Sequence, residues 1–417
     1  MKKSLLLIIS SLVLLSCSQT NVKSNDIMIV SDTHFLGDEI SSHTDKYNSV
    51  NFGLDGRVQE ADDAILDSII DTANEKKPGV LIISGDLTFN GEKQSHIELS
   101  ERLKEISNKT QVLVIPGNHD ILSCETYSFK DGEMKSCADI DEKEFIQIYH
   151  SYGYDQALYK DDNSLSYVYK LNSKQWIFML DSAMYYQNNF NGFNTVGGYL
   201  MPDTLSWMEN ILQKAKKDKV SVITCMHHNL ALHNERFSYG YRINNYEEVI
   251  SLLTKYDVKL NLSGHLHIQS INKVDVNDKE IFDIASNSTS IYGNTYGYLK
   301  TDNNRYDYQN NFLNVKWETD FSQYSLNKFI KRYTSRIKDQ ILKLFSEENA
   351  DKMCEVLSMI NAYYFSGRLS LLKEYLQKNE SLINLYKESI EDYDNSYMKT
   401  ILDDGLTKNN ISLVIEK

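Results

Sequence analysis

Five apolar runs, each ended by polar residues, constrain the fold of this chain more than any other feature. The runs are rich in β-branched residues and read Ile27–Ser31, Val80–Ser84, Gln111–Ile115, Val220–Met226 and Val258–Ser263. Helical patterns precede or separate them, at Val58–Ala73, Lys93–Ile106, Leu205–Lys217 and Tyr246–Lys255. This alternation predicts βαβ units and therefore an α/β fold.

The segments that follow the five runs carry the polar chemistry. They are Asp32-Thr33-His34, Gly85-Asp86, Pro116-Gly117-Asn118-His119-Asp120, His227-His228 and Gly264-His265-Leu266-His267. Residues two apart on an extended chain point to the same side, which pairs the first Asp with its His and the last two His with each other. Ligand groups gather at the carboxyl ends of strands in an open α/β sheet, so we expect the five segments to converge.

The donor types in these segments predict a metal centre. They are imidazole, carboxylate and amide oxygen without a thiolate, a mixture that suits divalent Mn, Fe or Zn. The chain has 10 histidines, and most of them fall within these motifs. Such clustering is hard to explain by structural roles alone.

In their order along the chain, the motifs Asp-x-His, Gly-Asp, Gly-Asn-His-Asp, His-His and Gly-His-x-His resemble those of the calcineurin-like metallophosphoesterase family. The resemblance implies a four-layer αββα sandwich with a two-metal site. It implies that Asp86 bridges the ions, with the remaining ligands Asp32, His34 and His267 on one and Asn118, His227 and His265 on the other. A hydroxide between the ions would attack phosphorus in line.

The same resemblance implies catalytic roles for two neighbouring residues. His119 would stabilise the transition state or protonate the leaving oxygen, and Asp120 would orient His119. The stretch Gly85–Glu92 and the segment His227-His228-Asn229 are similar to class III cyclic-nucleotide phosphodiesterases, although many relatives carry Pro where this chain has Asn229. We therefore expect a phosphodiesterase that cleaves a cyclic nucleotide or a similar small diester.

Two alternatives to a phosphodiesterase remain open. A phosphomonoesterase or nucleotidase of the same family could use the same metal site. A surface lipoprotein that binds metal without turnover belongs to another class, and the intact His119 and Asp120 speak against it.

Three further residues are candidates for substrate binding. Arg57 could bind a phosphate oxygen as a bidentate donor, or it could form an ion pair at the start of a helix. His228 neighbours the expected ligand His227, and His233 follows shortly after, so either could line the pocket.

The first residues predict export and a lipid anchor. Lys2 and Lys3 precede the apolar run Leu5–Leu15, which is too short to span a membrane and fits the core of a signal peptide. The run leads into Leu14-Leu15-Ser16-Cys17, which resembles a bacterial lipobox, so within the signal segment 1–17 we expect cleavage before Cys17 and lipid on the sulfur of Cys17. The alternative is an ordinary secretory signal with an incidental Cys.

Residues 18–25 are then a linker, and the protein is expected at the extracytoplasmic face of the bacterial cell membrane. The net charge of -14 argues against a nucleic-acid polymer as partner and gives no help in binding anionic lipid. A small phosphate ester remains compatible with this charge, because bound cations reverse the local field.

The remaining chain divides near residue 320. Residues 26–320 are the expected phosphoesterase domain, with further strands at Ser166–Leu171, Trp176–Leu180, Ile281–Ala285 and Asn311–Glu318. Residues 321–417 are expected to form an all-α C-terminal domain, with helical patterns at Leu326–Phe345, Ala350–Phe365, Leu369–Leu376 and Leu382–Ile390. Cys124 and Cys137 could form a disulfide or remain free thiols.

Overall fold

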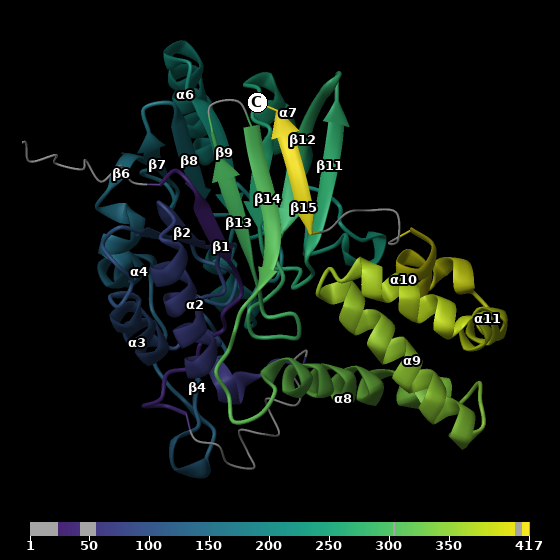
Figure 1. Ribbon diagram of the computed structural model, residues 1–417. Coiled ribbons are helices and arrows are strands. Elements are labelled where there is room, and N and C mark those ends of the chain that lie inside the picture. Colours follow the sequence, from purple (N-terminus) through teal and green to yellow (C-terminus); the bar gives the residue numbers. More distant parts are fainter. Residues whose placement is uncertain (1–23, 42–55, 303–304, 405–410, 417) are drawn as a thin grey trace, which may run out of the picture.

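Two β-sheets that face each other form the frame of the molecule. The computed structural model describes residues 24–41, 56–302, 305–404 and 411–416 (Figure 1). The first sheet has the order β15-β14-β13-β1-β2-β3, with bounds Ser412–Glu416, Arg305–Phe312, Thr295–Thr301, Ile27–Val30, Val80–Ile83 and Gln111–Val114. The second has the order β11-β12-β10-β9-β8-β7-β6, with bounds Ser270–Val276, Lys279–Ala285, Leu260–Ser263, Ser221–Met226, Gln175–Leu180, Tyr167–Asn172 and Ala157–Lys160.

The strand β8 shows why the sheets stack. Successive side chains of a strand point to opposite faces. Ile177 and Met179 belong to the core that also contains β1, β2 and β3, whereas Trp176, Phe178 and Leu180 pack with helices on the other face. Because β8 is apolar on both faces, it has to be covered on both, which places it in the middle of a layered structure.

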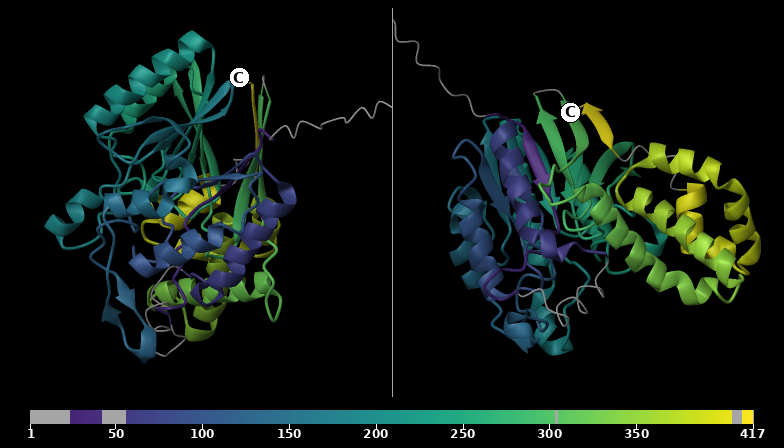
Figure 2. Two further views of the ribbon diagram at one scale, coloured as in Figure 1. Left: turned by 90° about the vertical axis from the view of Figure 1, so that its left-hand side faces the viewer. Right: turned by 60° about the horizontal axis from the view of Figure 1, so that its bottom comes forward.

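Helices cover the outer faces of both sheets (Figure 2). Helices α2 (Asp62–Lys76) and α3 (Lys93–Leu103) contribute to the core around β1, β2 and β3. Helices α6 (Pro202–Asp218) and α7 (Tyr246–Lys255) cover β8 and β9. The four layers confirm the predicted αββα sandwich.

The five runs lie in two different sheets, whereas we inferred their convergence from the behaviour of a single open sheet. β1, β2 and β3 pair in parallel in the first sheet, whereas β9 and β10 pair in parallel in the second. Their carboxyl ends still meet, because the two sheets are stacked and the loops that leave them bond to each other. The amide of His265, after β10 in the second sheet, donates to Oδ2 of Asp32, after β1 in the first sheet, at 3.0 Å.

A bundle of helices lies beside the sheets, shown in yellow-green and yellow in Figures 1 and 2. We call residues 321–404 the helical region. Its α-helices are α8 (Phe321–Ile341), α9 (Glu347–Phe365), α10 (Leu369–Lys378), α11 (Glu380–Ser389) and α12 (Tyr397–Lys399). The side chain of Asp320 caps α8 by accepting from the amide of Gln323. The region confirms the predicted all-α part of the fold.

The chain returns to the first sheet after the helical region. Residues 412–416, which the sequence analysis includes in the helical domain, form β15 and pair antiparallel with β14. The amide of Asn310 donates to the carbonyl of Ile411 at 2.7 Å, so the helical region leaves and re-enters at neighbouring positions. The predicted strand Asn311–Glu318 is wrong over most of its length, because β14 ends at Phe312 and a loop leads into α8.

Three sequence-based expectations concern the ends and the cysteines. The predicted signal peptide 1–17 with its Cys17, and most of the linker 18–25, lie outside the described residues. Among the helices that the structure does describe, none has the length and apolar character to cross a membrane. Cys124 and Cys137 are free thiols.

Candidate metal centre

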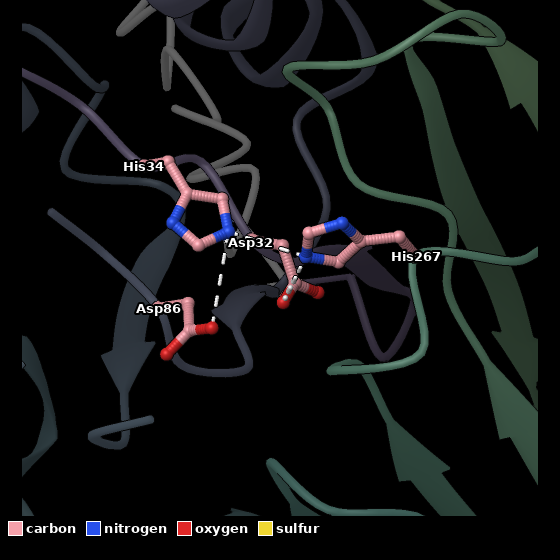
Figure 3. Close-up of side chains that lie close together, drawn as sticks. All are labelled: Asp32, His34, Asp86 and His267. Carbon is pink, nitrogen blue, oxygen red and sulfur yellow. Dashed lines mark hydrogen bonds and ion pairs between the residues drawn. The ribbon is translucent and has the colours of Figure 1, made fainter. Parts of the chain in front are cut away.

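The loops that follow β1, β2, β3, β9 and β10 bring the seven predicted ligands together. One group consists of Asp32, His34, Asp86 and His267 (Figure 3), and a second consists of Asp86, His227 and His265. Within each group the potential ligand atoms lie within 4.8 Å of one another. Asn118 joins the second group, because its Oδ1 lies 3.2 Å from Nε2 of His227. Asp86 is common to both groups.

Short distances join the ligand atoms within each group. In the first group, Nε2 of His267 lies 3.2 Å from Oδ1 of Asp32 and 3.2 Å from Nε2 of His34. In the second group, Nε2 of His227 lies 3.3 Å from Oδ2 of Asp86 and 3.1 Å from Nδ1 of His265. The same oxygen of Asp86 lies 3.8 Å from Nε2 of His34, so one carboxylate faces both groups.

The backbone at the centre is strained. Asp32, His34, Asp86, His265 and His267 all have positive φ, between 45° and 65°. Residues with a side chain rarely adopt this left-handed region, and it persists only where surrounding contacts enforce it. Each positive φ turns the chain sharply just after its strand, which aims the side chain inward.

Hydrogen bonds between loops enforce this conformation. The amide of His34 donates to the carbonyl of Asp86 at 3.0 Å, and the amide of His265 donates to Oδ2 of Asp32 at 3.0 Å. Two glycines allow the close approach. A Cβ on Gly117 would lie 2.2 Å from Oδ1 of Asp86, and a Cβ on Gly264 would lie 1.8 Å from Oγ of Ser31. No larger side chain fits at these positions without displacing the ligand loops.

The electrostatics show that the donor set fits a cation. Burial alone would raise the pKa of Asp86, yet the histidines beside it, His227 first, hold that pKa well below its usual range. Burial also opposes a proton on His227, but Asp86 outweighs it and raises the pKa of His227 to about 9. Burial lowers the pKa of His265 to about 3. The centre therefore draws positive charge to the point where these atoms meet, which a divalent ion would supply.

Backbone carbonyls orient the histidines of the second group. Nδ1 of His227 bonds to the carbonyl of Ser84 and Nε2 of His265 bonds to the carbonyl of Gly240, each at 2.9 Å. These bonds leave the opposite ring nitrogen facing the centre. In the first group, Nδ1 of His34 is buried and has no hydrogen-bond partner within the described parts of the chain.

His119 lies at the edge of the centre. Its Nε2 is 4.0 Å from Oδ2 of Asp86, and its side chain keeps 24% of its surface exposed. The prediction that Asp120 orients His119 is wrong. Nδ1 of His119 instead contacts Oδ1 of Asn90 at 2.6 Å, a partner that the sequence analysis did not single out within the quoted stretch Gly85–Glu92.

Asp120 has a different role, because its carboxylate bonds to backbone amides and not to His119. It is fully buried and accepts from the amides of Gly117 at 2.8 Å, Thr88 at 3.0 Å and Leu87 at 3.1 Å. Asp120 thereby joins the loop of Asp86 to the loop of Asn118. Burial raises its pKa to about 6.

The predicted substrate-binding roles of His228 and His233 are wrong. His228 is buried, and both ring nitrogens have partners at 2.9 Å, Oγ of Ser182 and the carbonyl of Val196. His233 is buried between Oγ of Ser270 at 3.0 Å and Oδ2 of Asp283 at 3.1 Å. Neither ring has a nitrogen left for a ligand. Both are core histidines.

Arg57 lines a cavity of about 230 Å³ that opens over the centre. The cavity wall also includes Asp86, Asn118, His119, His265 and His267. Arg57 is buried, and its charge is felt at His119, where it helps burial to lower the imidazole pKa to about 4. Of the three candidate substrate-binding residues, Arg57 alone reaches the cavity.

Comparison with known proteins gives two family matches in one chain. Residues 26–269 match the family described as calcineurin-like phosphoesterase, and residues 306–408 match the C-terminal domain of cyclic nucleotide phosphodiesterase. No curated protein matches the chain.

Among solved structures, a dimetal phosphatase from Danio rerio aligns at 10% identity over 68% of this chain and 95% of its own, with a TM-score of 0.45. A purple acid phosphatase from yellow lupin (Lupinus luteus) seeds aligns at 13% identity over 69% of this chain and 51% of its own, with a TM-score of 0.44.

Proposed function

Because this chain belongs to the calcineurin-like phosphoesterase family, and is therefore a hydrolase of phosphoric esters, we propose that it is a phosphodiesterase. The proposed substrate is a cyclic nucleotide or a similar small diester. The match of residues 306–408 to the C-terminal domain of cyclic nucleotide phosphodiesterase carries this choice. It favours a diesterase over the monoesterase or nucleotidase that the same centre could serve.

The centre would hold two divalent ions, Mn, Fe or Zn, with Asp86 shared between them. Asp32, His34 and His267 complete the proposed first ligand set, and Asn118, His227 and His265 complete the second. Such a pair of ions supplies a Lewis acid for the phosphoryl oxygens and lowers the pKa of bound water.

His119 is the residue that we assign to proton transfer. The contact of its Nδ1 with Asn90 orients the ring and leaves Nε2 facing the cavity. Because Nδ1 donates to Asn90, Nε2 carries a proton only in the imidazolium form, and in that form it would donate a hydrogen bond to a phosphoryl oxygen or give its proton to the leaving oxygen. The strained loops and the buried Asp120 keep the surrounding groups in place during the reaction.

A comparison of two chromogenic esters tests the proposal. The purified protein, loaded with Mn, is assayed on bis-p-nitrophenyl phosphate and on p-nitrophenyl phosphate. We expect a higher kcat/KM for the diester. Preference for the monoester would favour the monoesterase or nucleotidase. Absence of turnover with Mn, Fe and Zn would favour a protein that binds metal without catalysis.

The expected lipid anchor on Cys17 remains a separate proposal, supported by the lipobox-like sequence alone. Cys17→Ser should move the protein from the membrane fraction to the soluble fraction of cells that express it. Unchanged fractionation of the variant would contradict the anchor.

A further inference from the structure

The helical region is built onto the loop that carries two of the proposed ligands. Residues alternate along this loop. His265 and His267 face the centre, whereas Leu266 and Ile268 between and after them are buried in the apolar core of α9 to α12. The amide of Gln269 donates to the carbonyl of Phe365, at the end of α9, at 2.8 Å. The helical region is therefore continuous with the metal centre.

A second contact joins the helical region to the loop after β9. Nδ2 of Asn234 donates to the hydroxyl of Tyr364 at 3.0 Å and to Oγ1 of Thr400 at 2.9 Å. Asn234 itself is buried. The loops after β9 and β10 thus hold the helices at a fixed place over the centre.

This placement makes the helical region one wall of the cavity. Its lining includes His119 and four of the proposed ligands, Asp86, Asn118, His265 and His267, together with residues of α8, α9 and α12. The α8 contribution includes Arg332 and Arg336, which are four residues apart and so share one face of the helix. Arg332 is half-buried, and Arg336 is exposed.

The charge of this wall contrasts with that of the chain. The chain has a net charge of -14, yet the described residues that line the cavity include three arginines, Arg57, Arg332 and Arg336, and only one acidic residue, Asp86. Guanidinium groups bind phosphate oxygens through two parallel hydrogen bonds. The arginines of α8 therefore place guanidinium groups on the cavity wall that the helical region forms.

Aromatic rings line the cavity between these two charged parts. Phe237 packs on Tyr241 with ring centroids 5.1 Å apart and on Tyr397 of α12 at 5.5 Å, and Tyr241 packs on His265 at 5.2 Å. All three aromatic residues border the cavity. Their rings offer apolar surface for a nucleobase or another flat group.

We propose that Arg332 and Arg336 bind a second phosphate of the substrate, separate from the phosphate that is cleaved at the metal centre. The substrate class is then a nucleotide diester that carries a further phosphate group, rather than a nucleotide diester whose only phosphate is the one that is cleaved. The inference rests on the proposed function for the cleaved bond. It assigns the helical region a direct part in substrate selection.

Matched substrates test this assignment. Thymidine 5′-(p-nitrophenyl phosphate) is compared with the same compound carrying a 3′-phosphate, in the Mn-loaded full chain. We expect the 3′-phosphate to raise kcat/KM by about tenfold or more, as charge-assisted hydrogen bonds do. In the double variant Arg332→Gln, Arg336→Gln the ratio of the two kcat/KM values should fall to about one.

Lys338→Gln is the control. It removes one positive charge from the same helix, but Lys338 pairs with Asp351 at 3.0 Å and is not a lining residue of the cavity. We expect the control to keep the substrate ratio of the original protein. A ratio near one in the original protein, or an equal loss in the control, would overturn the proposal.

A binding measurement separates this proposal from the proposed function. Calorimetry compares thymidine 3′,5′-bisphosphate with thymidine 5′-monophosphate, which needs no turnover. The bisphosphate should bind about tenfold tighter in the original protein and no tighter in the arginine double variant. Absence of diester turnover would reject the phosphodiesterase, whereas equal binding of both nucleotides would reject the second phosphate site.

Discussion

The two ligand groups share Asp86 but differ in how their histidines are held. In the second group, His227 and His265 each bond through the outer ring nitrogen to a backbone carbonyl, at 2.9 Å. In the first group, Nδ1 of His34 has no such partner within the described residues, and the carbonyl of His267 is held by Nδ2 of Asn287 at 2.8 Å. The second group is fixed at its rings, and the first is fixed mainly at its backbone.

This difference bears on metal affinity. A hydrogen bond to the outer nitrogen fixes the tautomer and the direction of the lone pair that meets the ion. His34 lacks this hydrogen bond at its outer nitrogen, so we expect an ion in the first group to bind less tightly.

Removal of the shared ligand should have the largest effect, because it breaks both groups at once. Asp86→Ala takes away the one carboxylate that faces both sets of histidines. We expect activity on bis-p-nitrophenyl phosphate to fall by about ten-thousandfold, since metal chemistry supplies several kcal/mol of the rate. Metal content should fall below one ion per chain. A variant that retained two ions would show that the groups are independent.

Removal of His119 should impair the reaction while leaving both groups filled. His119→Ala is expected to lower kcat by about a thousandfold, within the range for general acid catalysis. Elemental analysis should still find the metal content of the original protein. Loss of metal from this variant would show that His119 belongs to a ligand group.

Asn90→Ala is the matched variant for His119. It removes the oxygen that contacts Nδ1 but leaves the imidazole in place. The loss in kcat should therefore be smaller, about tenfold, because only the orientation of the acid is affected. A loss as large as that of His119→Ala would mean that Asn90 itself contacts the substrate.

Chelation should separate the two groups directly. On titration of the metal-loaded protein with EDTA, we expect two stages, with about 10- to 100-fold different affinities, because hydrogen bonds to ligating histidines change metal affinity by this amount. Ions remaining per chain are measured at each step. Release in one stage would contradict the inferred difference.

Asn287→Ala should produce the smallest effect and should act on the first stage alone. The substitution frees the carbonyl of His267, so the weaker ion should be released at about tenfold lower chelator concentration. The second stage should not move, because Asn287 makes no described hydrogen bond to His227 or His265. A shift of both stages would indicate general loosening of the fold.

The sequence was sufficient to predict the strands that lead into the centre and the convergence of the motifs that follow them. Alternating apolar runs and helical patterns predicted β1, β2, β3, β9 and β10 to within a few residues, and the polar residues after them do meet. The reason is local, since period-two and helical patterns are readable in short windows. The division of these strands between two sheets has no local pattern, because it depends on which strands pair.

The direction of single side chains could not be read from the sequence. Asp120 and His119 are adjacent, yet one is buried under a loop and the other faces the cavity. His228 and His233 lie near a ligand along the chain, but hydrogen bonds to Ser182 and Asp283 hold them in the core. Arg332 and Arg336 line the same cavity as Asp86 although more than 200 positions of chain separate them from it, and only the packing of α8 brings them there.

The pairing of β14 with β15 makes the helical region an insertion at the tip of a β-hairpin. The two strands are neighbours, and the positions where the chain leaves and returns are joined by the bond from Asn310 to Ile411. Insertions at such tips are tolerated because the host strands need only a turn to connect them. An enzyme with this two-sheet fold could therefore gain or replace the helical region as one unit, provided that the new segment covers the apolar side chains of Leu266 and Ile268.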